Sequence, residues 1–264
     1  MQPLQPHKSE YWLFPKIDNW EKFAKRVALV CHFILRAIKG TDPNLHVLSV
    51  DEKTGIQAIE RYQSIAPKSK GGHQRKEFEY TRHGTTTLIA AINVANGELA
   101  NAHLKPTRDE KDYADFIKET VGALPEMDKV VILSDQLNTH LSETLVRFIA
   151  EQGGYSEEDL GIKGEKGILK NMQTRKVFLE SEYHRIRFIF TPKHCSWLNP
   201  IENWFAKLQR HVIKNGNFLS VKELEDKIKS YITFYNSRLA KALKWKFKGF
   251  LKSKILLNIS VNHL

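Results

Sequence analysis

Three acidic residues, carried by separate parts of the chain, are the residues best suited to chemistry. Asp51 and Asp135 each end a short apolar run that has the composition of a β-strand. Glu202 follows a third such run and lies in the first turn of a helix that we expect to begin at Asn199. Carboxylates that converge from separate elements are the ligands with which Mg²⁺ acts on phosphates. In a basic protein, this pattern predicts a metal site for a phosphate-containing substrate.

Each acid also has a purely structural interpretation. Asp51 could begin a hairpin turn and Asp135 could cap a loop or a helix, because aspartate is common at both places. Glu202 has the strongest structural alternative. With Asn199 as the N-cap and Pro200 as the first helical residue, Glu202 would complete a capping box. Only the three acids taken together favour a metal site.

A pair of metal ions would explain why three acids are needed. Two Mg²⁺ ions held about 4 Å apart require several carboxylates, one of which bridges both ions. Such ions lower the pKa of an attacking water or hydroxyl and stabilise the leaving 3′-oxygen of a displacement at phosphorus. Without metal, ionised carboxylates held this close repel one another. Glu52 is a weaker candidate than Asp51, because adjacent residues of a strand point to opposite faces.

The charge of the chain favours a polyanionic partner. Its 264 residues carry a net charge of +11, and residues 203–264 hold 13 Lys and Arg against 3 Asp and Glu. Such a surface attracts nucleic acid and releases counterions on binding, although a solvated basic face has the same composition. Cys31 and Cys195 make no disulfide framework, and we find neither a signal peptide nor a membrane span. We therefore expect a cytoplasmic protein.

The pattern of apolar residues predicts the elements that position these acids. Strands are expected where β-branched and apolar residues alternate or run together, at 46–51, 56–62, 85–94, 129–134 and 186–190. Helices are expected where apolar residues recur at helical spacing, at 18–39 with Asp18 as its cap, 107–124, 142–152, 199–214 and 221–235. Residues 52–55 would form the turn between the first two strands, and residues 64–84 a loop.

This order of elements predicts an α/β fold. The first three strands are expected to be antiparallel, because the first link is too short for a crossover, and the later strands parallel, because helices join them. The predicted architecture is a mixed sheet with helices on both faces, in the order of the ribonuclease-H-like fold. Residues 153–185 carry five glycines, interrupt that order and are expected to form an insertion at the sheet edge.

Four motifs, in this order, resemble those of the DDE transposases of the IS630 group, which belongs to the Tc1/mariner superfamily. The resemblance runs from about residue 10 to about residue 249. Its motifs are VDEKTGIQ at 50–57, RHGTTTL at 82–88, DQLNTH at 135–140 and TPKHCSWLNPIE at 191–202.

The resemblance implies a ribonuclease-H-like catalytic domain over residues 41–240, with Asp51, Asp135 and Glu202 as catalytic metal ligands. It also implies two Mg²⁺ ions, which Mn²⁺ can replace, together with cleavage at transposon ends and strand transfer into target DNA. DNA is therefore the expected partner and a homodimer the expected assembly, in a bacterial cytoplasm and associated with the nucleoid.

The chain departs from this family in three respects. The stretch between Asp135 and Glu202 is much longer than usual, and residues 153–185 account for the excess. Gln136 stands where the group usually has Asn, a change that keeps the amide. The group normally begins with helix-turn-helix modules, whereas residues 10–40 resemble only the segment that joins such modules to the catalytic domain. We assign residues 1–40 to an N-terminal arm and a linker helix. We therefore expect a catalytic half, from a decayed element or with a DNA-binding half encoded by a separate reading frame.

Other residues are candidates for supporting roles. Trp197 and Asn199 resemble positions that seat the last acid. His140 either contacts DNA or metal or is an ordinary histidine at the start of a helix. The residues expected to contact DNA are Arg82, Lys193, Lys207, Lys244, Lys246 and Lys248.

The basic tail, residues 241–264, has two interpretations. Its lysines alternate with Trp245 and Phe247, a pattern that suits phosphate contact combined with base stacking. A packed aromatic strand with solvated lysines would show the same alternation.

Two other functions remain open for the whole chain. A ribonuclease-H-like nuclease would cut DNA without joining it, and an inactive transposase remnant would bind DNA without cutting it. The adjacent pair His194–Cys195 is a poor thiol nucleophile, because neighbouring residues rarely face each other and no further His–Asn pair is placed to assist.

Overall fold

The computed structural model describes residues 17–61, 64–65, 75–76 and 79–250. Residues 1–16 of the expected N-terminal arm and residues 251–264 of the expected tail at 241–264 lie outside the described residues. A five-stranded mixed sheet has the order β5-β4-β1-β6-β7. Its strands are β1 (Leu45–Glu60), β4 (Thr81–Asn93), β5 (Leu99–Lys105), β6 (Lys129–Ser134) and β7 (Ile186–Phe190). Within the stretch expected to be a loop, β2 (Ser64–Ile65) and β3 (Arg75–Lys76) pair in antiparallel orientation.

The strand directions agree with the prediction, but the first three strands differ from those expected. β1, β4 and β5 are antiparallel to their neighbours, whereas β1, β6 and β7 are parallel. The predicted turn at 52–55 and hairpin partner at 56–62 are wrong, because β1 continues through both. Gly55 has φ +64, and the pairing with β4 shifts register between Lys53 and Ile56, so the glycine forms a bulge that keeps the strand continuous.

Seven α-helices surround the described sheet. They are α1 (Trp20–Lys39), α2 (Glu110–Gly122), α3 (Glu143–Gly153), α4 (Glu157–Leu160), α5 (Met172–Leu179), α6 (Ile201–Leu208) and α7 (Val221–Phe234). Short 3-10 turns are η2 (Asn138–Leu141), η3 (Ile168–Lys170) and η4 (Ser196–Leu198), and single π-turns, η5 (Gln209–Ile213) and η6 (Tyr235–Leu239), follow α6 and α7. The cap of α1 is Asn19, which accepts from the backbone of Lys22, and the predicted cap at Asp18 is wrong.

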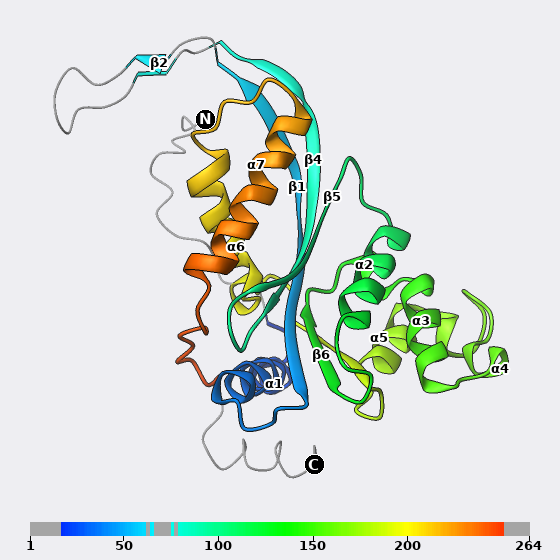
Figure 1. Cartoon of the computed structure of the whole chain (residues 1–264). Coiled ribbons are helices and arrows are strands. Elements are labelled where there is room, and N and C mark those ends of the chain that lie inside the picture. Colours follow the sequence, from blue (N-terminus) through cyan, green and yellow to red (C-terminus); the bar gives the residue numbers. More distant parts are fainter. Residues whose placement is uncertain (1–16, 62–63, 66–74, 77–78, 251–264) are drawn as a thin grey trace, which may run out of the picture.

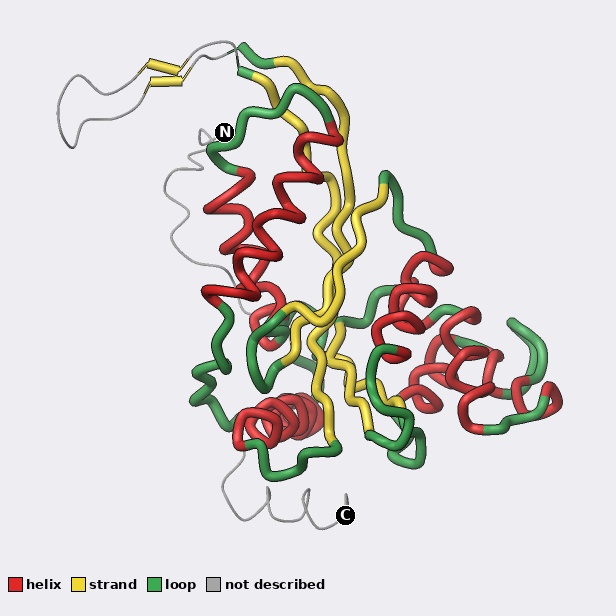
Figure 2. The backbone as a smooth tube through the Cα atoms, in the orientation of Figure 1, coloured by secondary structure: helices red, strands yellow, loops and turns green. Residues whose placement is uncertain are grey.

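The helices cover both faces of the sheet, as predicted (Figure 1). Leu48 and Val50 of β1 pack against α2, α3 and α5 on one face, whereas Val47 points to the other face and packs against α1. α6 and α7 lie on the same face as α1 and cover the long ribbon that β1 and β4 form beyond the rest of the sheet (Figure 2). The site residues therefore lie in a layered α/β frame with helices on each side.

Residues 153–185 are part of this frame. Leu160, Leu169 and Phe178 of this segment are buried in the same core as α2 and α3. Arg26 of α1 forms a double hydrogen bond with Glu180, at 2.5 and 2.9 Å. Over the described residues, none of the helices has the length and apolar character to cross a membrane.

Candidate active site

Asp51 and Asp135 lie beside each other where the parallel part of the sheet ends. β1 pairs with β6 up to Ser49↔Leu133, and the same register places Asp51 next to Asp135 on strands about 5 Å apart. Asp51 was expected at a strand end, but it lies within β1 and pairs on its other side with Ala90. The carboxyl ends of parallel strands are where ligands gather in open sheets, so the two aspartates occupy a favourable place for a site.

Asn199 attaches the start of α6 to β1. Its Oδ1 accepts a hydrogen bond from Ser49 Oγ at 2.5 Å, and its Nδ2 donates to Asp51 Oδ2 at 3.0 Å and to the Val50 carbonyl at 3.2 Å. Ser49 Oγ in turn accepts from the backbone N–H of Ile201 at 2.9 Å. Because Asn199 and Ser49 are both buried, this network fixes Asp51 and the first turn of α6 together.

The predicted helix cap at Asn199 is therefore wrong. Pro200 occupies the N-cap position of α6, and no side chain caps the helix. A buried amide without partners costs about 1–3 kcal/mol, whereas a helix cap contributes about 1 kcal/mol. Asn199 accordingly serves the buried network, and Glu202 lies in the first turn without a capping role. Asn199 thus seats Asp51 directly and, through Ser49, also fixes the turn of α6 that carries the last acid.

A buried pair, Glu52 and His140, lies behind Asp135. His140 Nε2 is 2.9 Å from Glu52 Oε2, and its Nδ1 is 2.7 Å from Asp135 Oδ1. The imidazole is fully buried and stacks on the ring of Tyr113, with 4.1 Å between centroids. Arg108 adds a second cation, 3.5 Å from Glu52 Oε2. His140 therefore lies in the short helix η2, is buried, and connects the two acids.

The charges of His140 and Asp135 follow from the shifts of their pKa values. Burial lowers the pKa of His140, but the hydrogen bonds and charges of Asp135 and Glu52 outweigh burial and raise it to about 9. Burial would raise the pKa of Asp135, but its hydrogen bond with His140 and the histidine's charge outweigh burial and lower it. At neutral pH the imidazolium donates from both ring nitrogens and orients an ionised Asp135.

Sequence reasoning undervalued Glu52 and missed Arg108. Glu52 does point away from Asp51, as strand alternation predicts, yet it reaches the site through His140. The signal was present in the sequence as a histidine five residues after Asp135 and a second acid beside Asp51. Linking the two required the register of β1 and β6.

Burial, with a smaller contribution from repulsion between the acids, distinguishes Asp51 and Glu202 from Asp135. Burial raises the pKa of Asp51 to about 7, and the charges of Asp135 and Glu202 add to the rise. Burial also raises the pKa of Glu202, while the charge of Lys53 opposes it. Like charges gathered in one place disfavour ionisation, and a divalent cation between them would remove that cost.

A cavity of about 500 Å³ opens over these groups. The acids line it together with the cations Arg108 and Lys193, and the loop after β7 forms one side. The lining residues are Asp51, Glu52, Arg108, Asp135, Gln136, Leu137, Thr191, Pro192, Lys193, His194, Cys195, Ser196 and Glu202. The structure therefore brings the three predicted acids and Lys193 to one cavity.

The oxygen donors in this cavity suit a hard divalent cation that keeps much of its water. Asp51 and Asp135 present carboxylates side by side, and Mg²⁺ is commonly bound through one or two carboxylates and several waters. Within the described part of the chain, no three His, Cys, Asp or Glu side chains are gathered closely enough to hold an ion by themselves. Glu202 thus shares the cavity without completing a preformed cage.

The segment 153–185 supports the cavity without blocking it. Lys176 of α5 donates to Gln136 Oε1 at 2.8 Å, and Gln136 Nε2 donates to the Thr191 carbonyl at 2.7 Å. Beside this bridge, β7 pairs with β6 along its whole length. The additional length before the third acid therefore leaves the register around the site intact.

Comparison with known proteins decides the family. Residues 46–225, more than half of the chain, match the family described as DDE superfamily endonuclease. The chain belongs to this superfamily. No curated protein matches the chain.

Solved mariner structures share the fold of this DDE chain. The Mos1 mariner paired end complex with Mn superposes with a TM-score of 0.53 at 13% identity, over 90% of this chain and 63% of that one. The Mos1 Strand Transfer Complex gives 0.52 at 15% identity, over 88% and 59%. A pre-cleavage Mos1 transpososome gives 0.51 at 14% identity, over 90% and 63%. The likeness confirms the predicted ribonuclease-H-like fold, and the DDE chain spans about three fifths of the length of these relatives.

The basic residues predicted to contact DNA are spread over the DDE domain. Lys193 lines the cavity of the acids, and Lys207 and Lys244 line a second cavity beside it. Arg82 pairs with Ile59 at the far end of β1, roughly 25 Å along the strand from the aspartates. The structure therefore gathers some of these residues near the acids and leaves Arg82 distant.

The C-terminal segment, residues 241–250, uses its rings for packing. Trp245 and Phe247 lie against the core cluster beneath α1, and Phe247 lies 5.6 Å from the half-exposed ring of Trp197. Lys246 and Lys248 alternate with these rings and are exposed. The structure agrees with the packing interpretation of these two rings, but the segment is irregular and not a strand.

Proposed function

We propose that this DDE-superfamily domain is the catalytic domain of an IS630-group transposase. It cuts DNA at transposon ends and joins the freed 3′-hydroxyl to target DNA, with Mg²⁺ or Mn²⁺ as cofactor. The observation that supports this most is the placement of Asp51 beside Asp135, with Glu202 in the same cavity. Proteins of the same fold have been solved as a paired end complex with Mn and as a Strand Transfer Complex.

In this proposal the chain's main task is to hold acids at fixed positions. Asp51 and Asp135 would bind the metal ions, and Glu202 would complete the second site. Two ions bound there supply activation of the attacking oxygen and stabilisation of the leaving 3′-oxygen. Asn199 fixes Asp51 by a direct hydrogen bond, and His140 fixes Asp135 by another. Such preorganisation is the main protein contribution to phosphoryl transfer, which depends on positioning and electrostatics.

Substrate attraction in this proposal comes from the cations around the acids. Arg108 and Lys193 line the cavity and place positive charge beside the position of a scissile phosphate. The basic residues beyond the cavity extend the same field, which would guide DNA toward the site and release counterions on binding.

The domain arrangement is part of the same proposal. Residues 1–40 would form the arm and linker helix, 41–240 the catalytic domain with its insertion at 153–185, and 241–264 a basic tail. DNA, a second copy of the chain and a helix-turn-helix half encoded by a separate reading frame are the proposed partners.

The test is Mg²⁺-dependent cleavage of DNA that carries the ends of the element. Asp135→Asn should abolish cleavage, while Asp115→Asn, at a half-exposed carboxylate paired with Lys111, should leave it unchanged. Cleavage that survives in Asp135→Asn would sink the assignment. Pre-cut ends then separate a transposase, which joins them to a target, from a nuclease, which does not. Salt-sensitive DNA binding with no cleavage in either Mg²⁺ or Mn²⁺ would identify an inactive remnant.

A further inference from the structure

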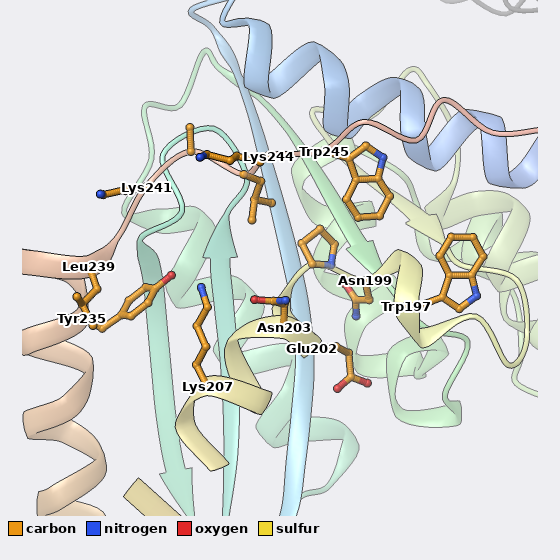
Figure 3. Close-up of a pocket in the computed structure, with 13 residues that line it drawn as sticks. Trp197, Asn199, Glu202, Asn203, Lys207, Tyr235, Leu239, Lys241, Lys244 and Trp245 are labelled. Atoms are coloured by element: carbon orange, nitrogen blue, oxygen red, sulfur yellow. The ribbon is translucent and has the colours of Figure 1, made fainter. Parts of the chain in front are cut away.

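A second cavity, of about 620 Å³, adjoins the cavity of the acids. Glu202 lines both cavities, so they lie on either side of this one residue. We call the second one the lysine groove. It lies between three parts of the chain that are far apart in sequence: the first turns of α6, the end of α7 with η6, and residues 241–245 (Figure 3).

The charged lining of the lysine groove is strongly positive. Lys207, Lys241 and Lys244 line it together with a single acid, Glu202. In Figure 3, Lys207 rises from α6 toward the segment that carries Lys241 and Lys244. None of the three lysines takes part in an ion pair between described residues. Their charges are therefore available to an anionic ligand.

The remainder of the groove is largely apolar. Tyr235, Leu239 and Leu243 line it, and the ammonium of Lys207 lies 5.4 Å from the centre of the Tyr235 ring. A free phosphate ion would contact only the lysines and would leave the apolar part of the groove exposed to water. A nucleotide has both parts, because its phosphate suits lysines and its sugar or base suits an aromatic and aliphatic surface. Lys207 and Tyr235, already in contact, would serve the two parts of one nucleotide.

We propose that the lysine groove holds the DNA strand where it leaves the active site. Phosphates next to the scissile one lie on Lys207 and Lys244, and a sugar or base lies against Tyr235. The groove has the volume of a typical small-ligand site, enough for one or two nucleotides. Its continuity with the acids at Glu202 gives the strand a path from one cavity into the other. The inference rests on the proposed function, since it takes the acids as the place of cleavage.

Binding without catalysis tests this inference. The probe is a single-stranded oligothymidylate about 12 nucleotides long, measured by fluorescence anisotropy in EDTA over a range of salt concentrations. Each lysine–phosphate contact contributes about 0.7 to the salt slope of a single strand, so Lys207→Gln/Lys244→Gln should lower the slope by about 1.4. At 0.1 M salt the same loss corresponds to roughly 25-fold weaker binding.

Two further variants separate the groove from general charge effects. Lys227→Gln/Lys229→Gln removes the same charge from exposed positions of α7 outside the groove, and it should shift binding by less than about twofold. Lys207→Arg/Lys244→Arg keeps the charge and should keep the slope. Equal effects of the two glutamine pairs, or no binding of the oligonucleotide by the unaltered protein, would overturn the inference.

Together with a cleavage assay, the binding experiment distinguishes failure of the groove proposal from failure of the transposase proposal. If the unaltered protein cleaves DNA while the groove variant binds like the control, the groove is refuted and the transposase proposal stands. If the groove variant loses binding but the unaltered protein never cleaves in Mg²⁺ or Mn²⁺, the groove stands and the catalytic proposal fails.

Discussion

Glu52→Gln should destabilise the protein although it changes neither size nor shape. Glu52 is 1% exposed and accepts from His140 Nε2 at 2.9 Å. A hydrogen bond between charged groups contributes about 1.5–3 kcal/mol and a neutral one about 0.5–1.5. Leaving one partner of a buried ion pair uncompensated costs about 3–5 kcal/mol. Gln keeps one hydrogen bond and Asp135 still faces the imidazolium, so we expect a loss of about 2–3 kcal/mol in the free energy of unfolding.

Urea unfolding at neutral pH in EDTA measures this loss. For a chain of this size the urea slope is about 3 kcal/mol per molar, so the midpoint should fall by about 0.7–1 M. Glu157→Gln is the matched control, because its side chain is 78% exposed and its pair with Arg147 should contribute under about 1 kcal/mol.

A double-mutant cycle with His140→Gln isolates the pair itself. We expect a coupling free energy of at least about 1 kcal/mol between Glu52 and His140, since the two side chains are in direct contact. Additivity within about 0.5 kcal/mol, or a Glu52→Gln midpoint equal to that of the control, would refute the reasoning.

Other perturbations test other parts of the site. Asn199→Ala leaves buried polar groups of β1 unpaired and should cost about 1–3 kcal/mol, seen as a lower melting temperature. Gly97→Ala places a Cβ 2.0 Å from the carbonyl oxygen of Lys241 at a backbone φ of +78, so it should displace the C-terminal segment and speed trypsin cleavage there. Mn²⁺ at about 100 times its Kd should stabilise the unaltered protein by about 2.7 kcal/mol, and Asp51→Asn should remove most of this gain.

The positions of the predicted acids could largely be inferred from local sequence patterns. Asp135 follows a continuous apolar run of the kind that makes a buried central strand, and β6 ends one residue before it. Glu202 follows another apolar run and opens α6. In both cases the acid lies within a few residues of the sequence pattern that predicts the strand or helix carrying it.

The course of β1 could not be inferred in the same way. The sequence 52–55 contains a glycine and charged residues typical of a turn, yet pairing with β4 extends through them. A bulge at Gly55 and a turn at Gly55 have the same local composition, and only the cross-strand partners of β4 decide between them.

The hydrogen-bond partners of Asn199 could not be inferred for a related reason. Asn–Pro before a helix is a common capping sequence, and local reasoning assigns the amide to the helix. The structure assigns it to Ser49 and Asp51, about 150 residues earlier in the chain. A buried polar network outweighs a local cap, but its members are identified only when the fold brings them together.

The most direct measurement is a crystal structure of the unaltered protein grown with Mn²⁺ and recorded at a wavelength where manganese scatters anomalously. The account predicts an anomalous peak about 2 Å from carboxylate oxygens of both Asp51 and Asp135, with Glu202 facing the same cavity. A peak at other residues, or none at saturating Mn²⁺, would contradict the assignment of these acids as the metal site.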